Sequence, residues 1–503
     1  IIILLLWMKK INSALISVFS KEGIDDLCKE LHRNNVKIIS TGGTQKHIES
    51  LNIPVTSVES LTDYPSILGG RVKTLHPKVF GSILSRSNNQ SDLVDEKEYD
   101  LSKIDLVIVD LYPFQKTVES TDDESDIIEK IDIGGVSLIR AAAKNFSDVT
   151  IISSKKQYKD FLDYLLKNEF KTDLNFRKGL AFEAFSVISE YDIHIQEFFG
   201  KSTGVYKKLR YGENPHQAAF FNGDIEDVFD KLNGKELSYN NLLDIDAGIR
   251  LISEFSLTTF AILKHNNACG ISSSSNVTTS YLNAFEADPL SAFGGVLITN
   301  KKIDVNAAEK MNSLFFEIII SPGYTDEALS ILKSKKNRII LLQKKEVHKK
   351  FTVKSILNGS LKQESDNIKN ISKKWKAVTK VKSEKNQLKD LEFANKIVKH
   401  SKSNAIVLVK DQQMISSGVG QTSRVDALKF AIEKAKTFKF DLSGSVMASD
   451  AFFPFPDCIE IASQAGISAV VQPGGSIKDQ LSIDACDERG MAMYLSGIRH
   501  FYH

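Results

Sequence analysis

The sequence predicts an α/β fold divided into several packed parts. Its 503 residues are too many for one hydrophobic core, since domains usually run to about 100–200 residues. Short apolar runs rich in β-branched residues alternate with helical stretches along the chain. The run at 104–109 is continuously apolar, which is typical of a strand buried in a parallel sheet. Alternation of this kind indicates a sheet covered by helices on both faces.

The expected elements of the first part follow in order along the first 200 residues. Each expected strand is a short apolar run, and each expected helix spaces its apolar residues at helical intervals. The expected strands are 14–19, 36–40, 104–109 and 149–152, and the expected helices are 24–34, 45–51, 135–144 and 176–191. The small and polar run at 200–204 (GKSTG) then predicts a linker.

The alternation resumes after this linker. The expected helices are 240–255, 391–401 and 425–436, and the expected strands are 258–264, 293–299, 317–321, 405–410, 445–449 and 468–472. Two segments, 260–264 (FAILK) and 406–410 (IVLVK), each end an apolar strand with a lysine after a long helix, which indicates an internal duplication. Between them, 333–385 is rich in lysine. A solvated surface is the simplest interpretation of that stretch, and polyanion binding is the alternative.

Composition and charge restrict the class of protein. Hydrophobic residues make up 42% of the chain and charged residues 25%, and the formal net charge is +2, so no nucleic-acid partner is expected. The four cysteines form no C-x-x-C, which favours free thiols in a reducing compartment and a cytoplasmic protein. Residues 1–7 are apolar but too few to span a bilayer, and no membrane association is expected. We expect 1–7 to be an upstream read-through or an artefact, with Met8 as the natural start.

Two glycine-containing motifs in the first part predict an anion site. The run Ser40, Thr41, Gly42, Gly43, Thr44 follows a strand and opens a helix, so backbone N–H groups and the helix dipole can meet a phosphate. The alternative is a tight turn without a ligand. The run 69–77 (GGRVKTLHP) adds Arg71, which can hold a phosphate or carboxylate in a fork, and Lys73, which can act as a point charge. An exposed basic loop would not need the flanking glycines and proline.

Two further motifs in the first part carry polar groups at element ends. The run 110–114 (DLYPF) follows the buried strand at its carboxyl end, where ligands bind in open α/β sheets. Tyr112 could donate a hydrogen bond to a developing oxyanion there, with aromatic packing as the alternative. The run 131–135 (IDIGG) places Asp132 before a helix that ends at Lys144. Because a lysine at a helix end is usually solvated, Lys144 is weak evidence on its own.

The second part concentrates polar side chains around two strand or loop ends. In the run 209–217 (LRYGENPHQ), Arg210, Tyr211 and His216 could together hold a nucleotide phosphate and base. The run 264–267 (KHNN) comes directly after an apolar strand, and four polar groups in succession cannot all be core. We therefore expect Lys264 and His265 to carry the chemistry of this part.

Two later motifs could complete that site. The run 418–424 (GVGQTSR) is a glycine turn with Arg424 at a helix start, where a cation opposes the helix dipole unless an anion or a carboxylate is present. The run 449–457 (SDAFFPFPD) could form a flat aromatic wall for a heterocycle, with hydrophobic packing as the alternative. No Walker loop, G-x-G-x-x-G or HExxH occurs, and the one H-x-E at 47–49 has no C-x-x-C, so a zinc deaminase site is excluded and no metal is expected.

Ten motifs in order resemble one family. They are STGGT, GGRVKTLHP, DLYPF, IDIGG, AAAKN, LRYGENPHQ, KHNNACG, SAFGG, SGVGQTSR and SDAFFPF. This series is similar to the bifunctional purine-biosynthesis enzymes, in which aminoimidazole carboxamide ribonucleotide (AICAR) transformylase is fused to IMP cyclohydrolase. The resemblance implies a methylglyoxal-synthase-like first domain and a second part with a tandem-duplicated cytidine-deaminase-like fold that lacks the zinc. It also implies a homodimer with transformylase sites at the subunit interface.

The resemblance also implies substrates and residue roles. The formyl donor would be 10-formyltetrahydrofolate, with AICAR, formyl-AICAR and IMP as the other small-molecule partners, no catalytic metal, and a structural monovalent cation left open. His265 would be the general base of formyl transfer, assisted by Lys264. The family's nucleotide and folate positions correspond to Arg210, Tyr211, Asn404, Arg424, Phe452, Asp457 and Arg499. Its cyclohydrolase residues correspond to Lys73, Tyr112, Asp132 and Lys144, with 40–44 and Arg71 at the 5′-phosphate.

The expected domains are 11–199 for the cyclohydrolase, and 205–375 and 376–503 for the two transformylase subdomains. Two alternatives are weighed against the bifunctional enzyme. One is a nucleotide-binding protein that has lost one of the activities. The other is a polyanion-binding protein that uses the basic stretch, which the small net charge disfavours.

Overall fold

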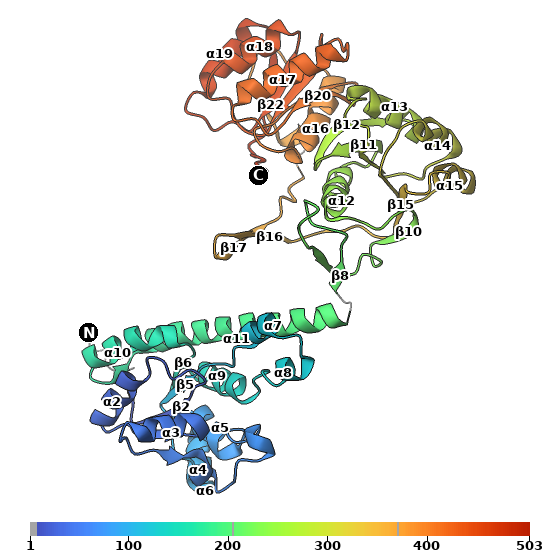
Figure 1. Cartoon of the computed structure of the whole chain (residues 1–503). Coiled ribbons are helices and arrows are strands. Elements are labelled where there is room, and N and C mark those ends of the chain that lie inside the picture. The colour runs from blue at the N-terminus through green and yellow to red at the C-terminus, as the bar shows by residue number, and fades with distance from the viewer. Residues whose placement is uncertain (1–7, 204–205, 370–371) are drawn as a thin grey trace. The chain divides into compact units, whose positions relative to one another are not determined.

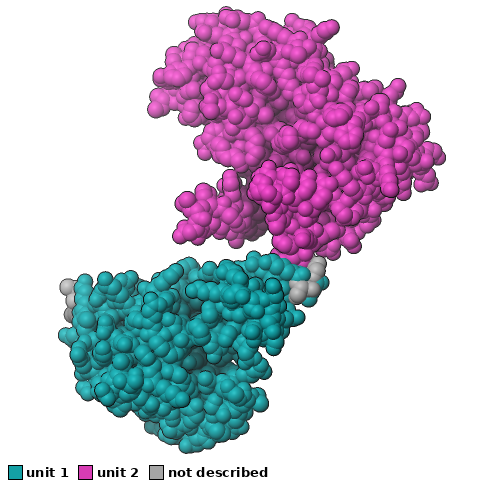
Figure 2. Space-filling model, viewed as in Figure 1, with its two compact units in different colours: residues 1–205 teal, residues 206–503 magenta. Residues whose placement is uncertain are grey.

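The chain divides into two compact units, residues 1–205 and 206–503 (Figure 2). The computed structural model describes residues 8–203, 206–369 and 372–503. The expectations about the apolar segment 1–7 and about Gly204 in the linker therefore concern residues outside the described part. Each unit has its own sheet and its own hydrophobic core.

The main sheet of unit 1 is parallel, and its described strands run in the order β4-β3-β2-β5-β6. The strands are β2 (Ser13–Ser17), β3 (Lys37–Ser40), β4 (Thr56–Ser57), β5 (Leu106–Val109) and β6 (Thr150–Ile152). Strands β3 and β4 lie on one side of β2, and β5 and β6 lie on the other, so the strand order reverses at β2. Ligands of open α/β sheets bind at the carboxyl ends of the strands beside such a reversal. The predicted α/β fold is confirmed, and a ligand site is expected between β2 and β5.

Helices cover this sheet (Figure 1), with α9 and α11 packed against β6 and α2 and α3 against β3. The helices of unit 1 are α2 (Asp25–Arg33), α3 (Gly42–Ser50), α4 (Val58–Thr62), α5 (Pro77–Leu84), α6 (Gln90–Glu98), α7 (Phe114–Ser120), α8 (Glu124–Ile128), α9 (Gly134–Lys144), α10 (Tyr158–Lys167) and α11 (Leu174–Ser202). Short 3-10 turns lie at Leu68–Gly70 and Lys155–Gln157, and β1 (Lys9–Lys10) pairs with β7 (Lys171–Thr172).

Helix α11 is longer than the sequence predicts. It was expected over 176–191 with a linker from residue 200, but it runs through Ser202. The ring of Phe198 lies 5.9 Å from that of Phe114, and Ile195 packs against the same buried cluster. These apolar contacts extend the helix beyond the point where the local sequence becomes small and polar, so the linker prediction is wrong for 200–202.

Unit 2 contains two repeats of the same ten elements. The first repeat is β10 (Phe229–Asn233), α12 (Tyr239–Ile252), β11 (Thr258–Lys264), β12 (Asn267–Ser274), α13 (Val277–Ala287), β13 (Val296–Thr299), α14 (Val305–Asn312), β14 (Ile318–Ser321), α15 (Asp326–Lys333) and β15 (Ile339–Gln343). The second is β18 (Lys376–Ala377), α16 (Lys385–Lys399), β19 (Ile406–Lys410), β20 (Gln413–Gly418), α17 (Arg424–Thr437), β21 (Val446–Ser449), α18 (Asp457–Gln464), β22 (Ala469–Gln472), α19 (Asp479–Glu488) and β23 (Ala492–Leu495).

The two repeats form one sheet of 12 described strands. Across the sheet, the strand order of the second repeat is the reverse of that of the first. In each repeat the first long strand pairs antiparallel with the next two strands, and two parallel pairings follow. The repeats meet where Ser272 of β12 pairs with Gln413 of β20. This arrangement agrees with the internal duplication that the two lysine-ended strands indicate.

Alternate residues of each strand face opposite sides of this sheet. Leu263 and Val409 belong to one core that α12 and α16 share. Ile262 lies in a second core with α13, α14 and α15, and Leu408 lies in a third with α17, α18 and α19. One face is therefore covered jointly by the first helix of each repeat, and the other by two separate groups of three helices.

Short strands lie outside this sheet. The pairs are β8 (Tyr206–Lys208) with β9 (Phe220–Asn222), and β16 (Phe351–Ile356) with β17 (Gly359–Glu364). A 3-10 turn spans Ser372–Lys374. The hairpin β16–β17 lies within the lysine-rich stretch, where Lys344 pairs with Asp230 at 2.9 Å and Lys349 pairs with Asp246 at 2.7 Å. Acidic neighbours thus offset part of the charge of this stretch. Within the described residues, no helix is long and apolar enough to cross a membrane.

Candidate active sites

The glycine turn after β3 in unit 1 presents backbone donors and uses its hydroxyls internally. The Ser40 hydroxyl donates to the Ile16 carbonyl at 2.7 Å, and the Thr44 hydroxyl donates to the Val18 carbonyl at 2.9 Å. Both side chains are buried, so they tie β3 and α3 to β2 and do not face a ligand. The first N–H groups of α3, which begins at Gly42, have no partner within the helix and remain the donors of this turn.

The amine of Lys73 lies over this turn. A Cβ built on Gly42 would come within 3.3 Å of Lys73 Nζ, and one built on Gly70 within 3.5 Å of Lys73 Cε. Both glycines have positive φ, 55° and 96°, a conformation that side chains disfavour. The two glycines thus allow the lysine to approach the helix N-terminus, and the two predicted anion motifs meet at one place.

Asp132 lies just before α9, and the charge of Lys73 acts to lower its pKa. Its carboxylate accepts the Gly135 N–H at 2.6 Å, and its own N–H donates to the Tyr191 hydroxyl at 2.8 Å. Burial raises the pKa of Asp132, hydrogen bonds and Lys73 oppose the rise, and Asp110 adds to it. Burial and the charge of Asp132 also raise the pKa of Tyr112. The structure therefore brings three predicted residues, Lys73, Tyr112 and Asp132, into one electrostatic cluster.

Two residues of this cluster, Asp110 and Lys21, were given no role from the sequence. Asp110 follows β5 and accepts the N–H groups of Phe19 and Ser20, with Ser20 at 3.0 Å. Burial raises the pKa of Asp110 and lowers that of Lys21, whose amine donates to the Phe19 carbonyl at 3.1 Å. Asp110 lay inside a motif that the sequence singled out, whereas no local pattern marks Lys21.

Two predicted residues do not join the cluster directly: Arg71 is paired with Glu129, whose charge acts on Tyr112, and Lys144 lies at the far end of α9. The exposed guanidinium of Arg71 is hydrogen-bonded to the carboxylate of Glu129, so its fork is already occupied. Lys144 is the last residue of α9, while Asp132 precedes the first. Ten helical steps of about 1.5 Å separate the two ends by roughly 15 Å. The structure therefore does not bring Lys144 to Asp132 within this unit.

In unit 2, the polar run at 264–267 forms the turn of the hairpin β11–β12. Lys264 pairs with Asn267, and His265 and Asn266 occupy the turn with φ of 51° and 67°. The Lys264 amine donates to the Phe293 carbonyl at 2.9 Å. His265 is exposed at the tip of the turn. The prediction of a strand end is right, but the sequence did not indicate that a second strand follows at once.

A chain of hydrogen bonds links this turn to the second repeat. The Asn267 amide donates to the His265 carbonyl at 3.0 Å and accepts the Lys402 N–H at 3.1 Å. Two residues further on, Asn404 accepts a hydrogen bond from Arg424 at 2.8 Å, and Arg424 is paired with buried Asp450 at 2.9 Å. The carboxylate that the Arg424 motif requires is therefore Asp450. His265, Asn404 and Arg424 lie along one network where the repeats join.

The carboxy-terminal segment runs beside this network. Tyr502 and Ser403 exchange hydrogen bonds of 2.9 and 3.0 Å, and the His500 N–H donates to the Asp450 carbonyl at 3.0 Å. Exposed Arg499 directly precedes His500 in the chain, and its guanidinium lies 4.5 Å from the centre of the Phe501 ring. Arg424 also donates to the Phe452 carbonyl at 3.4 Å. Asp457 begins α18, and its carboxylate accepts the Cys458 N–H at 2.8 Å.

Arg210, Tyr211 and His216 lie on a loop before α12. The Arg210 guanidinium donates to the Tyr211 hydroxyl at 2.9 Å, and the Asn240 amide ties this loop to α12 through the Glu213 carbonyl at 3.1 Å. In the part of the chain that the structure describes, no hydrogen bond or ring contact joins these three residues to Lys264 or His265. The loop and the turn are both held by α12, the turn through Asp244, which the sequence did not single out.

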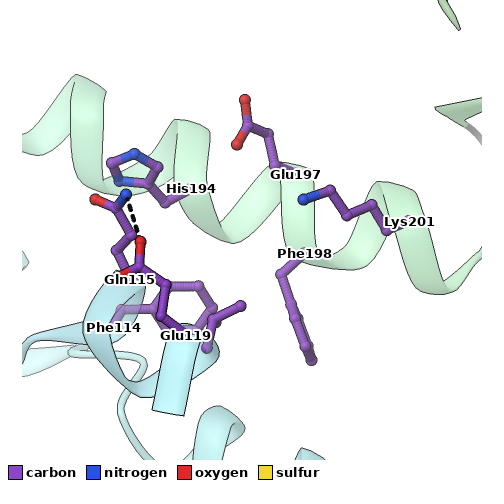
Figure 3. A pocket seen from close by; sticks show the side chains of 8 residues that line it. Phe114, Gln115, Glu119, His194, Glu197, Phe198 and Lys201 are labelled. Atoms are coloured by element: carbon purple, nitrogen blue, oxygen red, sulfur yellow. Dashed lines mark hydrogen bonds between the residues drawn. The ribbon is translucent and has the colours of Figure 1, made fainter. Parts of the chain in front are cut away.

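A pocket of about 480 Å³ lies between α7 and α11 in unit 1 (Figure 3). Phe114, Gln115 and Glu119 of α7 face His194 and Phe198 of α11. None of the predicted site residues lines this pocket. Among the described residues, no group of three His, Cys, Asp or Glu side chains is arranged to hold a metal ion.

Comparison with known proteins covers both units. Residues 142–434 match the family model described as AICARFT/IMPCHase bienzyme, and residues 23–137 match the MGS-like domain. The bifunctional purine biosynthesis protein PurH of Bacteroides thetaiotaomicron is 56% identical over 98% of this chain and 99% of its own length. PurH of Aquifex aeolicus is 45% identical over 97% of this chain and 100% of its own. A solved structure titled "Crystal structure of ForH" is 33% identical and covers 37% of this chain and 96% of its own, with a TM-score of 0.34.

Proposed function

Because the chain belongs to the AICARFT/IMPCHase bienzyme family, we propose that each of its units carries one active site of a two-step reaction. The enzyme catalyses the last two steps of IMP synthesis, as a formyltransferase and a cyclohydrolase. A formyl group passes from 10-formyltetrahydrofolate to AICAR, and formyl-AICAR then loses water to give IMP. The observation that carries this function is the match of both units to bifunctional relatives over nearly their full length.

Formyl transfer is assigned to the turn of β11–β12. The AICAR amine attacks the formyl carbon, and His265 accepts the amine proton as the new N–C bond forms. The bond from the formyl carbon to the folate nitrogen breaks, and that nitrogen leaves with a proton, which Lys264 is placed to assist. The network through Asn404 and Arg424 supports a nucleotide and folate site at this join. The assigned binding residues are Arg210, Tyr211, His216, Asn404, Arg424, Phe452, Asp457 and Arg499.

Ring closure is assigned to the carboxyl ends of β2, β3 and β5. The carboxamide nitrogen attacks the formyl carbon, and the formyl oxygen leaves as water after two proton transfers. Lys73 and Tyr112 would stabilise that oxygen, and the raised pKa of Asp132 would help it to hold and return a proton. The amides of Gly42, Gly43 and Thr44 would hold the 5′-phosphate. Arg71 could join them only by leaving Glu129, and the role of Lys144 lacks geometric support.

A second copy of the chain is assigned to the apolar surface beside Lys264. Leu290, Phe293 and Phe315 expose 77%, 61% and 57% of their surface, and the two phenylalanine rings lie 5.0 Å apart. Phe293 is the residue whose carbonyl accepts the Lys264 amine, so a partner covering this surface would close the formyl-transfer site.

Sedimentation equilibrium tests this assembly. We expect a mass of twice 56.0 kDa for the native chain. Phe293→Ser should weaken the dimer and formyl transfer together, while ring closure of supplied formyl-AICAR continues. A monomeric native protein with full formyl-transfer activity would contradict a shared site.

We place the enzyme in the cytoplasm. The four cysteines are free and buried, as expected for a protein of a reducing compartment. Burial raises the pKa of each thiol to about 12, so none is a ready nucleophile. Separation of cell fractions, followed by detection of the protein, tests this placement.

The function is tested by supplying the purified protein with AICAR and 10-formyltetrahydrofolate and following tetrahydrofolate and IMP. Both products should form, and formyl-AICAR supplied alone should give IMP without folate. If no tetrahydrofolate forms, the transformylase assignment is wrong. If formyl-AICAR persists unchanged, the chain is instead a nucleotide-binding protein that has lost ring closure.

A further inference from the structure

The turn that carries His265 has a counterpart in the second repeat. His265 and Asn266 have φ of 51° and 67°, and Asp411 and Gln412, between β19 and β20, have φ of 53° and 57°. Two-residue turns of this shape favour Asn-Gly or Asp-Gly pairs, because residues with side chains are strained at positive φ. Neither turn contains glycine, so each gains from support outside its hairpin.

In both repeats an aspartate of the preceding helix supplies that support. Asp244, the sixth residue of α12, accepts the Asn266 N–H at 2.6 Å. Asp390, the sixth residue of α16, accepts the Gln412 N–H at 2.8 Å and the Asp411 N–H at 2.9 Å. The same structural device therefore holds a turn with a histidine in one repeat and a turn without one in the other.

The surroundings of the two carboxylates differ. The turn of the second repeat uses both oxygens of Asp390, which also accepts the Gln412 side-chain amide at 2.7 Å. Asp244 accepts a hydrogen bond from its turn with only one oxygen. The charges of Lys264, His265 and Glu317 act on its carboxylate. Burial raises the pKa of Asp244, while the Asn266 amide and the charges of His265 and Lys264 oppose that rise. Asp244 is therefore placed to interact with the histidine as well as with the backbone.

We propose that Asp244 is a positioning residue of formyl transfer, which fixes the His265 turn and stabilises the imidazolium formed when His265 accepts the amine proton. This role rests on the assignment of formyl transfer to unit 2. Asp390 performs only the first task, at a turn that has no histidine. Asp390 is therefore a matched control for the structural share of the effect.

The experiment compares Asp244→Asn and Asp244→Ala with Asp390→Asn and Asp390→Ala in the full-length enzyme. The amide oxygen of asparagine can still accept the Asn266 N–H, so Asp244→Asn removes mainly the charge. We expect its kcat for formyl transfer to fall roughly tenfold, with the KM for AICAR changed less than threefold and the acidic limb of the kcat profile moved to lower pH. Asp244→Ala should lose roughly a hundredfold. Both Asp390 variants should keep kcat within twofold, even where unit 2 melts earlier.

Several results would overturn the proposal. One is a kcat within twofold of the native value in both Asp244 variants, and another is an equal loss of kcat in the Asp390 variants. If Asp244→Ala does not fold, Asp244→Asn decides alone, since it keeps the turn acceptor. Native enzyme that releases no tetrahydrofolate would instead remove the assignment of formyl transfer, and ring closure of formyl-AICAR shows in every variant whether unit 1 is intact.

Discussion

A lysine at the end of an apolar strand was the first sign of the repeat, and its side chain has the same contact in both copies. The Lys264 amine donates to the Phe293 carbonyl at 2.9 Å, and the Lys410 amine donates to the Ser443 carbonyl at 2.8 Å. Each carbonyl lies three residues before the next antiparallel strand. Since Lys410 does this beside a turn without histidine, part of the role of Lys264 is to support the fold. The two lysines could be identified from the sequence, but the structural role that they share could not.

A buried ionic cluster makes the stability of unit 2 depend on pH. The side chain of Lys399 is 5% exposed and pairs with Glu254 at 2.7 Å, and His400 contacts the same carboxylate at 3.2 Å. Burial opposes ionisation of Glu254, but the hydrogen bonds from His400 and Lys399 prevail and lower its pKa to about 2. Burial lowers the pKa of His400 despite the pull of Glu254, with Lys399 and Arg250 acting in the same direction as burial.

We therefore predict that unit 2 loses stability as the pH falls. Below the ordinary histidine pKa, near 6.5, His400 binds a proton more readily in the unfolded chain than in the folded chain, so protonation favours unfolding. Stability that depends on ionised Glu254 is present above the ordinary glutamate pKa and is lost as the pH falls from there toward 2. Calorimetry of His400→Gln should show a flatter decline between pH 7 and pH 5. Glu254→Gln should cost about 3 kcal/mol at pH 7, since buried Lys399 would keep only Asp366, at 3.9 Å, as a charged partner. An unchanged slope in His400→Gln would contradict this explanation.

At the scale of elements, most apolar strands of unit 2 were predicted, although β15 (IILLQ) and β23 (AMYL) were not, and its polar strands were missed. The expected strand 258–264 coincides with β11, and 405–410 differs from β19 by one residue. Their partners β12 and β20 were missed because they are rich in serine and glycine, which carry little strand signal. These strands lie at the centre of the sheet, where the Thr259 and Ser273 hydroxyls are paired at 2.6 Å. Tertiary contacts that a local pattern does not contain therefore stabilise them.

Some site residues of unit 2 could be predicted from the sequence, and others could not. The sequence indicated Lys264, His265 and Arg424 from local polarity, but the resemblance alone suggested Asn404. Asn267 and Asp450 stood in predicted motifs without an assigned role, and Asp244 was missed, because each acts on a partner at least 20 residues away in the chain. Spacing along a sequence does not reveal such contacts.

The Tyr502 side chain adds to the backbone hydrogen bonds that hold the carboxy-terminal segment. Arg250 of α12 donates to the Tyr502 hydroxyl at 2.9 Å, and the Lys402 amine lies 4.3 Å from the centre of the Tyr502 ring. Tyr502→Ala should loosen the segment that carries Arg499, while the backbone hydrogen bonds to Ser403 and Asp450 remain. We expect the KM for AICAR in formyl transfer to rise about tenfold while ring closure is unaffected. An unchanged KM would show that the Tyr502 side chain does not support nucleotide binding.

At the scale of the whole molecule, we propose that two independent active sites share one chain. Each unit has its own sheet and core, and the two sets of assigned residues do not mix between units. His265→Ala should therefore fail to release tetrahydrofolate yet convert supplied formyl-AICAR to IMP. Lys73→Ala should release tetrahydrofolate and leave formyl-AICAR unconverted.

The most direct test mixes these two variants with AICAR and 10-formyltetrahydrofolate and measures IMP. Neither variant alone should form IMP from these substrates, and the mixture should form it, because formyl-AICAR made by Lys73→Ala is closed by His265→Ala. A mixture that releases tetrahydrofolate but forms no IMP, or a His265→Ala variant that cannot close supplied formyl-AICAR, would contradict two independent sites.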